Sequence, residues 1–296
     1  MSGKVIAVAN MKGGVGKTAT VVGLAETLAA SGRTVLVIDL DAQANASICI
    51  AGDAMLTDLI RRQCTFESFL NDFLHKRSTI SFDNCIRSNV SNVTHLGNQL
   101  PLSLLASGPA LRDLELKLVY VLTRKRMSWE QIVEALWGLM KIQLQRSRKS
   151  FDLVVIDCAP GISILTEVSI RLADLIIVPT IPDFLSTFGL EAFCINMWER
   201  GLNGKTKAPK HLPHVLATRC RQINIHRDTI GVLREEAKGA KAPFRMFATT
   251  IPETIAIADA LGKIEKYPPF SSKWTPAVVT ILTDLATEIQ GTLNGN

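Results

Sequence analysis

The stretch Lys12-Gly13-Gly14-Val15-Gly16-Lys17-Thr18 decides the fold expected for this chain. It follows a short apolar run at residues 5–9 and precedes a helical pattern that begins near Thr18. A strand, a glycine loop and a helix start in this order form a phosphate cradle, because the loop N–H groups point inward and the helix N-terminus adds positive potential. Side chains in the loop would block the approach of the backbone to a phosphate, which accounts for the glycines. The stretch predicts a nucleotide site in which Lys17 reaches the β- and γ-phosphates and the Thr18 hydroxyl ligates Mg²⁺.

The loop departs from the strict pattern G-x-x-x-x-G-K-[ST] at its first position, where Met11 stands. A second lysine, Lys12, comes immediately before the glycines. The form K-G-G-x-G-K-[ST] resembles the loop of the ParA/MinD family of P-loop ATPases. The resemblance implies that Lys12 reaches across a homodimer interface to the partner's nucleotide, and that Lys12 and Lys17 act in ATP hydrolysis. It also implies nucleotide contacts from the rest of the loop and the first helical turn, namely Gly13, Gly14, Val15, Gly16, Thr18 and Ala19.

Short apolar runs with β-like composition alternate with helical patterns along the chain. The runs lie at residues 5–9, 34–38, 153–156, 175–178 and 214–217, with a further plausible one at 244–248. Helical patterns occupy residues 18–31, 162–173, 186–200, 226–238 and 275–291. Most runs are apolar on both faces, as parallel strands covered by helices are. The alternation predicts an α/β fold of the P-loop NTPase type, with a doubly wound, mostly parallel sheet flanked by helices.

The segment from about residue 50 to 150 interrupts this alternation. Residues 53–77 and 110–148 have mostly helical patterns, with a possible hairpin or strand pair near residues 93–97 and 102–106. No linker rich in Gly, Ser or Pro separates the segment from the rest of the chain. We therefore expect one ParA-like ATPase domain over residues 1–296, with a helical elaboration at about 50–150.

Three aspartates follow or end two of the apolar runs. Asp39 and Asp41 come after the run at 34–38, and Asp157 ends the run at 153–156. Because the carboxyl ends of parallel strands face the ligand crevice, all three are expected beside the phosphates. Asp157 is in the Walker B arrangement and would hold Mg²⁺ opposite Thr18, directly or through water. By resemblance to the family's D-x-D-P-Q segment, Asp41 positions the hydrolytic water, while Asp39 supports the outer shell of the metal or the switch loop.

Two later segments are expected to contact the adenine base. Thr218 and Arg219 follow the run at 214–217, at the place where relatives carry adenine-contacting residues. Pro252 lies in a segment that resembles the family's late strand-to-loop segment. For Arg219, a DNA contact or a salt bridge stays open as an equal alternative.

The net charge of +6 is concentrated in one region. Residues 200–245 contain eleven Lys or Arg against three Asp or Glu, so the rest of the chain is close to neutral. Such a region indicates an anionic partner, and contacts to DNA phosphates need charge more than a particular geometry. A solvated basic face is the alternative. The candidate DNA contacts are Lys205, Lys207, Lys210, Arg219, Arg221, Arg227, Arg234, Lys238, Lys241 and Arg245.

The cysteines and the absence of targeting patterns bear on the compartment. Six cysteines are scattered without a C-x-x-C pair, which argues against a zinc site, an iron–sulfur carrier and a disulfide framework. The first apolar run follows Met1 without the pattern of a secretory signal, and no apolar run approaches the length of about 18 residues needed to span a bilayer. We expect a cytoplasmic, nucleoid-associated protein.

The resemblance implies a ParA-type partition or positioning ATPase. Its ATP-bound dimer would bind nonspecific DNA and would be released when a ParB-like partner stimulates hydrolysis, segregating plasmid or chromosome DNA. Two alternatives would use the same ATP site, a MinD-like membrane-cycling ATPase and a nucleoid-based positioner of a protein cargo. MinD-like proteins end in a basic amphipathic helix that lies on anionic lipid. Here the tail at 278–293 contains Asp284 and Glu288 and no Lys or Arg, so we expect a packed helix and no stable membrane anchor. A sequence-specific regulator would need a helix-turn-helix ahead of the glycine loop, and because Lys12 stands so near the start of this sequence we do not expect one.

Overall fold

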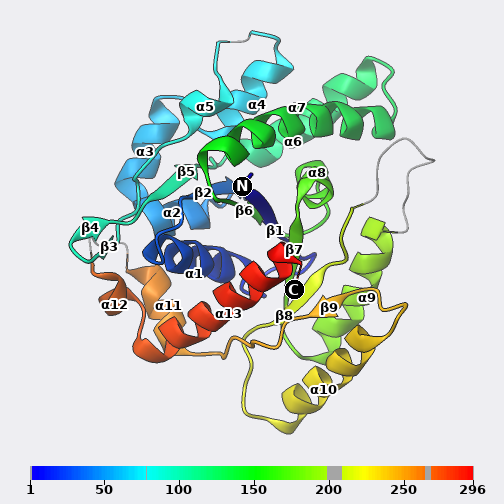
Figure 1. Cartoon of the computed structure of the whole chain (residues 1–296). Coiled ribbons are helices and arrows are strands. Elements are labelled where there is room, and N and C mark those ends of the chain that lie inside the picture. The colour runs from blue at the N-terminus through cyan, green and yellow to red at the C-terminus, as the bar shows by residue number, and fades with distance from the viewer. Residues whose placement is uncertain (1, 78, 199–208, 264–267, 296) are drawn as a thin grey trace.

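A seven-stranded parallel sheet lies at the centre of the computed structural model, which describes residues 2–77, 79–198, 209–263 and 268–295 (Figure 1). The strand order is β5-β2-β6-β1-β7-β8-β9, and every pairing within it is parallel. The predicted doubly wound sheet flanked by helices is confirmed. The strands are β1 (Lys4–Val8), β2 (Val35–Leu40), β5 (Leu102–Leu105), β6 (Leu153–Cys158), β7 (Leu175–Thr180), β8 (His214–Ala217) and β9 (Arg245–Met246).

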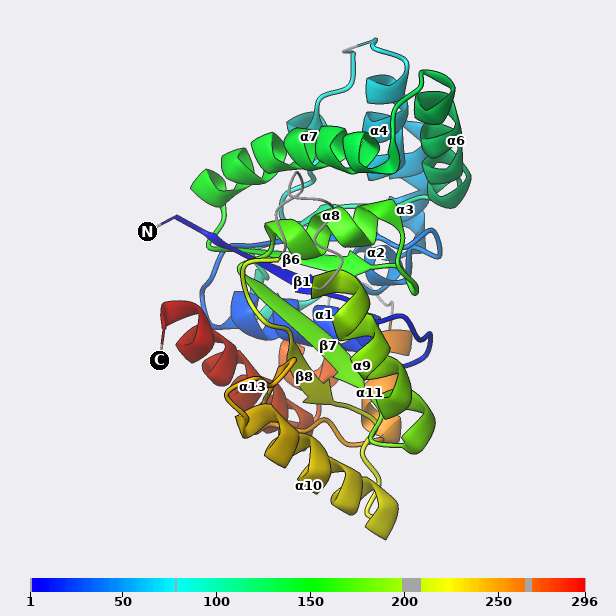
Figure 2. The ribbon, with the colours of Figure 1, turned by 90° about the vertical axis from the view of Figure 1, so that its right-hand side faces the viewer.

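The two faces of the sheet bury different sets of helices, because successive side chains of a strand point to opposite faces. In β1, Val5 and Ala7 belong to the core on one face, and Ile6 and Val8 to the core on the other. Figure 2 shows helices on both faces of the sheet. The helices that share the core with Ile6 are α1 (Lys17–Ala30), α2 (Asn45–Ala51), α3 (Asp53–Arg61), α11 (Ile255–Gly262), α12 (Phe270–Lys273) and α13 (Pro276–Asn294). Those that share the core with Val5 are α4 (Phe66–Leu74), α5 (Phe82–Cys85), α6 (Leu111–Arg124), α7 (Trp129–Ser150), α8 (Ile164–Leu172), α9 (Phe184–Trp198) and α10 (Asn224–Lys238).

Local signals in the sequence account for several helix ends. Helix α1 ends at Ala30, and Gly32 just beyond it has a φ of 86°, a left-handed conformation that glycine adopts without strain. Helix α7 begins with a capping box, in which Ser128 and Gln131 satisfy each other's backbone N–H groups. The mostly helical segment predicted over 110–148 consists of two helices, α6 and α7, and Arg126 between them has a φ of 61°.

The predicted strand pair at 93–106 differs from the structure in one respect. Residues 94–99 form a short antiparallel hairpin of β3 (Thr94–His95) and β4 (Asn98–Gln99). Residues 102–105 do not pair with this hairpin but form β5, which pairs with β2 in parallel and makes one edge of the main sheet. The apolar character of β5 suits this place, since all four residues are buried. The organisation of residues 1–296 as one domain stays a prediction.

The C-terminal helix α13 packs onto the nucleotide-loop helix α1. It buries Val278, Leu282, Leu285 and Ile289 in the core that α1 shares. This agrees with the packed helix expected for the tail. Across the residues that the structure describes, no helix has the length and apolar character needed to cross a bilayer.

Candidate nucleotide site

The glycine loop joins β1 to α1 at the carboxyl edge of the sheet. Gly14 and Gly16 have φ values of 75° and 89°, which a residue with a side chain adopts only with strain. A Cβ atom added to Gly13 or Gly14 would have no neighbour within 4 Å, so the space beside the loop is open. Lys17 Nζ donates to the Lys12 carbonyl oxygen at 3.0 Å. Burial lowers the pKa of Lys17, and the charge of Asp157 partly offsets this.

Thr18 and Asp157 meet beside this loop. Thr18 Oγ1 donates to Asp157 Oδ2 at 2.9 Å, which joins the first turn of α1 to the end of β6. The other oxygen, Asp157 Oδ1, is buried and has no hydrogen-bond partner within the described part of the chain. Burial raises the pKa of the Asp157 carboxyl well above its usual value, and the charge of Asp39 raises it further. A carboxylate oxygen without a hydrogen-bond partner, beside a hydroxyl, fits Mg²⁺, which would also favour the ionised carboxylate.

Asp39 is fully buried and holds the loop that follows β2. Its Oδ1 accepts from Asp41 N at 3.0 Å, and its Oδ2 accepts from Ser47 N at 2.9 Å and Ser47 Oγ at 2.7 Å. Burial raises the pKa of Asp39 to about 6, and the hydrogen bonds from Ser47 and Asp41 limit the rise. Both carboxylate oxygens of Asp39 accept hydrogen bonds from this loop. Asp39 therefore suits the expected role of supporting the switch loop better than direct contact with a metal.

Asp41 lies in the same loop, partly exposed, at the phosphate end of the site. Its Oδ1 accepts from Gln43 N at 3.0 Å, and Ala44, with a φ of 51°, turns the chain into α2. Its negative charge opposes the lowering of the Lys17 pKa and adds to the raising of the Asp157 pKa. Asp41 directly follows the end of β2, and its role toward water stays a proposal.

Lys12 contacts its own protomer in this structure. Its Nζ donates to Ser186 Oγ at 2.8 Å and lies 3.9 Å from Asp183 Oδ1, at the start of α9. The Lys12 side chain is still 43% exposed. The contacts of Lys12 with Asp183 and Ser186 were not predicted from the sequence. Ser186 stands 174 positions after Lys12, and no local pattern marks a contact over that separation.

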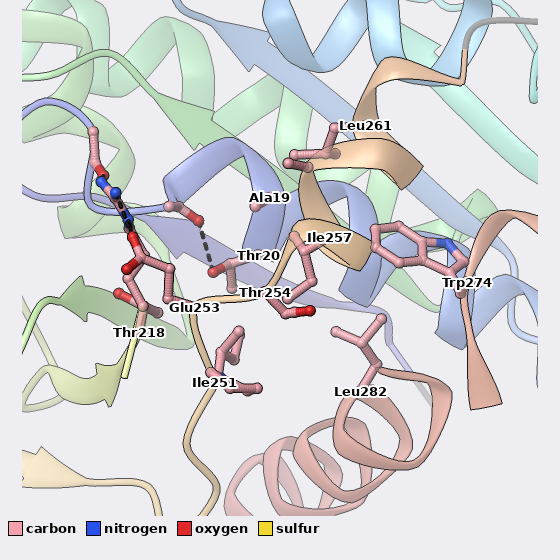
Figure 3. Close-up of a pocket in the computed structure, with 15 residues that line it drawn as sticks. Ala19, Thr20, Thr218, Ile251, Glu253, Thr254, Ile257, Leu261, Trp274 and Leu282 are labelled. Carbon is pink, nitrogen blue, oxygen red and sulfur yellow. Dashed lines mark hydrogen bonds and ion pairs between the residues drawn. The ribbon is translucent and has the colours of Figure 1, made fainter. Parts of the chain in front are cut away.

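A cavity of about 340 Å³ opens beside the glycine loop (Figure 3). Glu253 and Trp274 lie at opposite ends of it in this view. The end near Trp274 is apolar, with Ile257, Leu261 and Leu282 in its wall. Since an aromatic base prefers apolar walls and the phosphates belong at the glycine loop, the cavity suits the base and ribose of a nucleotide.

The residues predicted for the base site all line this cavity, together with Ala19. Thr218 Oγ1 donates to the Val15 carbonyl oxygen at 2.7 Å, so its hydroxyl supports the glycine loop. Pro252 and Cys220 pair in an isolated parallel β-bridge, which joins the segments after β9 and β8. Arg219 Nη1 donates to the Gly14 carbonyl oxygen at 3.1 Å, and the same guanidinium pairs with Glu253. Arg219 therefore lies at the phosphate end and makes a salt bridge, one of the alternatives left open.

At the apolar end of the cavity, Trp274 contacts a buried ion pair that could not be predicted from the sequence. Lys273 Nζ donates to Glu26 Oε1 at 2.6 Å, and Trp274 Nε1 donates to Glu26 Oε2 at 2.7 Å. Lys273 and Glu26 have fully buried side chains. The pair fixes Trp274 against α1, and a lone Glu in a helical pattern gives no signal for it.

The basic candidates for DNA contact fall into several places. Helix α10 carries Arg227, Arg234 and Lys238 but also three acidic residues, so the helix itself has no net charge. Lys238 pairs with Glu235 at 2.7 Å, and Arg234 Nη2 donates to the Ala248 carbonyl oxygen. The structure therefore brings these three cations to one exposed helix but pairs part of their charge.

The remaining basic candidates flank α10 or lie elsewhere. Arg221 precedes the helix and pairs with Glu253. Arg245 Nη1 donates to the Ala237 and Gly239 carbonyl oxygens at the end of α10. Lys241 follows the helix in the chain and is exposed. Lys210 lines a separate hollow beside α7. Lys205 and Lys207 lie outside the described residues.

Comparison with known proteins decides the family. The family model described as AAA domain matches residues 3–205. The sporulation initiation inhibitor protein Soj of Bacillus subtilis is 24% identical over 262 residues, which cover 87% of each chain. This chain belongs to the ParA/MinD family of P-loop ATPases. The resemblance inferred from the glycine loop is therefore confirmed.

Solved structures share the fold of this ParA/MinD-family protein. McdA of Cyanothece has a TM-score of 0.67 and 18% identity, covering 97% of this chain and 99% of McdA. The pNOB8 ParA bound to nonspecific DNA has a TM-score of 0.65 and 16% identity, covering 99% and 100%. Cobyrinic acid a,c-diamide synthase of Mycobacterium smegmatis, with an ATP analogue and magnesium, has a TM-score of 0.65 and 22% identity, covering 99% and 96%. The synthase shows that this fold serves more than one function, so the site residues must carry the argument.

Proposed function

We propose that this ParA/MinD-family protein hydrolyses ATP and that ATP binding closes a homodimer which binds nonspecific DNA. A ParB-like partner would stimulate hydrolysis and release the dimer, so that plasmid or chromosome DNA is segregated over the nucleoid in the cytoplasm. The observation that carries the ATPase part is the hydrogen bond between Thr18 and Asp157, whose Oδ1 has no hydrogen-bond partner in the described part of the chain. Thr18 follows Lys17 and a glycine loop with left-handed φ values.

The residues of the site would divide the work of hydrolysis among them. Bound Mg²⁺ supplies charge neutralisation on the phosphates. Thr18 Oγ1 and Asp157 would hold it, and the loop N–H groups would hold the phosphate oxygens. Lys17 Nζ would exchange the Lys12 carbonyl oxygen for a phosphate oxygen. Asp41 would accept a hydrogen bond from the attacking water and orient it, and Lys12 would leave Ser186 for the site of the other protomer.

The hydrolytic role is tested at Asp41. Asp41→Ala should bind ATP with near wild-type affinity and lose turnover by about a hundredfold or more, the range typical of removing one positioned group. Phosphate release measures turnover, and a fluorescent ATP analogue measures binding. Asp284→Ala, which removes an exposed carboxylate on α13, is the matched control and should turn over normally. Wild-type turnover in Asp41→Ala would place the catalytic role elsewhere.

The DNA-binding part rests on charge and on the relatives. The basic excess lies in residues 200–245, and dimer closure would bring two such surfaces onto one duplex and raise the combined affinity. The similar pNOB8 ParA binds nonspecific DNA. A MinD-like membrane cycle is disfavoured because the described C-terminal helix buries its apolar face against α1. A cargo-positioning role would use the same ATP site, and the identity of the stimulating partner separates it from DNA partition.

A further inference from the structure

A chain of polar contacts leads from the glycine loop to the start of α10. Arg219 Nη1 donates to the Gly14 carbonyl oxygen at 3.1 Å, while Arg219 Nε and Nη2 donate to Glu253 Oε1 at 2.9 and 2.5 Å. The second oxygen of Glu253 accepts from Arg221 Nε. Arg221 N donates in turn to His226 Nδ1 at 3.0 Å, in the first turn of α10. One carboxylate therefore holds two arginines, one of which touches the phosphate loop.

The backbone around this carboxylate is fixed on both sides. Cys220 N donates to the Ile251 carbonyl oxygen at 3.0 Å, and Glu253 N donates to the Cys220 carbonyl oxygen at 2.9 Å. Arg219 has a φ of 51°, an unusual conformation for a residue with a side chain. Such conformations persist where the surroundings hold them, and they concentrate at functional sites. These backbone hydrogen bonds thus hold Glu253 in place at one end of the cavity.

We propose that Glu253 is a positioning residue which competes with the nucleotide phosphates for Arg219. The proposal rests on the ATP site proposed above and adds a role for a residue that the sequence did not single out. Without nucleotide, the carboxylate holds the guanidinium at the rim of the glycine loop. When phosphates enter the loop, the guanidinium exchanges Glu253 for phosphate oxygens, and Arg221 keeps the carboxylate compensated.

The chemistry of the three groups supports an exchange. A guanidinium binds carboxylate and phosphate oxygens with the same planar fork, so either anion satisfies it. Arg219 already contacts Gly14, so its guanidinium lies beside the loop that would hold the phosphates. Hydrogen bonds from Arg221 and Arg219 lower the pKa of Glu253 to about 2, so the carboxylate is charged at neutral pH and competes there.

The test compares two variants that make the same charge change. Glu253→Gln removes the competitor, and Glu235→Gln removes a carboxylate that pairs with Lys238 on α10 and has no part in the chain of contacts. Titration with Mg²⁺ and a fluorescent ATP analogue should show about two- to five-fold tighter binding for Glu253→Gln, the range expected for freeing one partner of a partly exposed ion pair. Glu235→Gln should bind as the wild type does.

A second pair of variants separates this role from a merely structural one. In an Arg219→Gln background the Glu253→Gln change should have no effect on affinity, because the competition acts through Arg219. Glu253→Asp keeps the charge and should retain most of the wild-type behaviour. The proposal is overturned if Glu253→Gln binds the analogue no more tightly than wild type, or if the gain persists without Arg219. If the wild-type protein binds the analogue in this way but shows no ATP turnover, the proposed ATPase function fails and the role of Glu253 in binding still stands.

Discussion

Lys17 and Thr18 are adjacent in the chain and have different partners. Lys17 Nζ donates a hydrogen bond to the Lys12 carbonyl oxygen inside the glycine loop, and Thr18 Oγ1 donates one to Asp157 at the end of β6. A phosphate would replace the first contact, whereas a metal ion would join the second. The two side chains should therefore affect nucleotide binding in different ways.

Lys17→Ala should weaken ATP binding roughly ten- to a hundred-fold, the range for one hydrogen bond to a charged group. Thr18→Ala should weaken binding only when Mg²⁺ is present, because its hydroxyl serves the metal. Titration with a fluorescent ATP analogue, with and without Mg²⁺, measures both. Lys117→Ala, which removes an exposed lysine on α6, is the control. Unchanged affinity in Lys17→Ala would remove the phosphate-loop assignment.

Lys12 is bound in this structure by Ser186, and the proposed function needs it in the site of the other protomer. Lys12→Ala should keep part of its ATP affinity but lose ATP-dependent dimerisation and turnover. Ser186→Ala removes the contact within the protomer and leaves the lysine, so this variant should still dimerise with ATP. Light scattering with and without ATP decides the matter. A normal ATP-dependent dimer with normal turnover in Lys12→Ala would mean that the lysine is only an exposed side chain.

At the scale of elements, the loop between β2 and α2 depends on one buried carboxylate. Asp39 is held by Ser47 and Asp41 N, and burial raises its pKa to about 6 from a usual value near 4. Between these two pH values the folded protein binds more protons at Asp39 than the unfolded chain does. The stabilising contribution of protonated Asp39 is therefore complete below about pH 4 and is lost as the pH rises through about 6.

This loss is measurable against a variant that does not titrate. The free energy of unfolding of the wild type should fall relative to that of Asp39→Asn as the pH rises from about 4 to 6, by at most about 3 kcal/mol. Urea denaturation at pH 4, 5 and 6, without nucleotide or Mg²⁺, gives both values. A difference between the two proteins that stays constant over this range would contradict the effect of burial on Asp39.

The elements and the phosphate loop could be predicted from the sequence because their signals are local. The glycine spacing before Lys17, the apolar run ending in Asp157 and the helix stop at Gly32 each lie within a few residues. The partners of Lys12 and the support of Trp274 by Glu26 could not, because these contacts join distant segments through the fold.

The same limit applies to charge. A count of Lys and Arg in residues 200–245 shows the excess but not which charges are compensated. In the structure Arg219 and Arg221 share Glu253, and Lys238 pairs with Glu235. The charge available to DNA in the described region is therefore smaller than the count, and Lys241 is an exposed cation within it.

At the scale of the whole molecule, the central claim is that ATP converts this protein into a DNA-binding dimer. The most direct test measures affinity for duplex DNA of arbitrary sequence with ATP and with ADP, over a range of salt concentrations and with anionic vesicles as competitor. The account predicts much tighter binding with ATP, a fall in affinity with a log–log slope of about −0.9 per phosphate contact, and little effect of vesicles. Lys238→Glu with Lys241→Glu should weaken binding to all sequences alike, whereas Arg112→Glu with Lys117→Glu on α6 should not. Equal affinity with ATP and ADP, or no dependence on salt, would contradict the account.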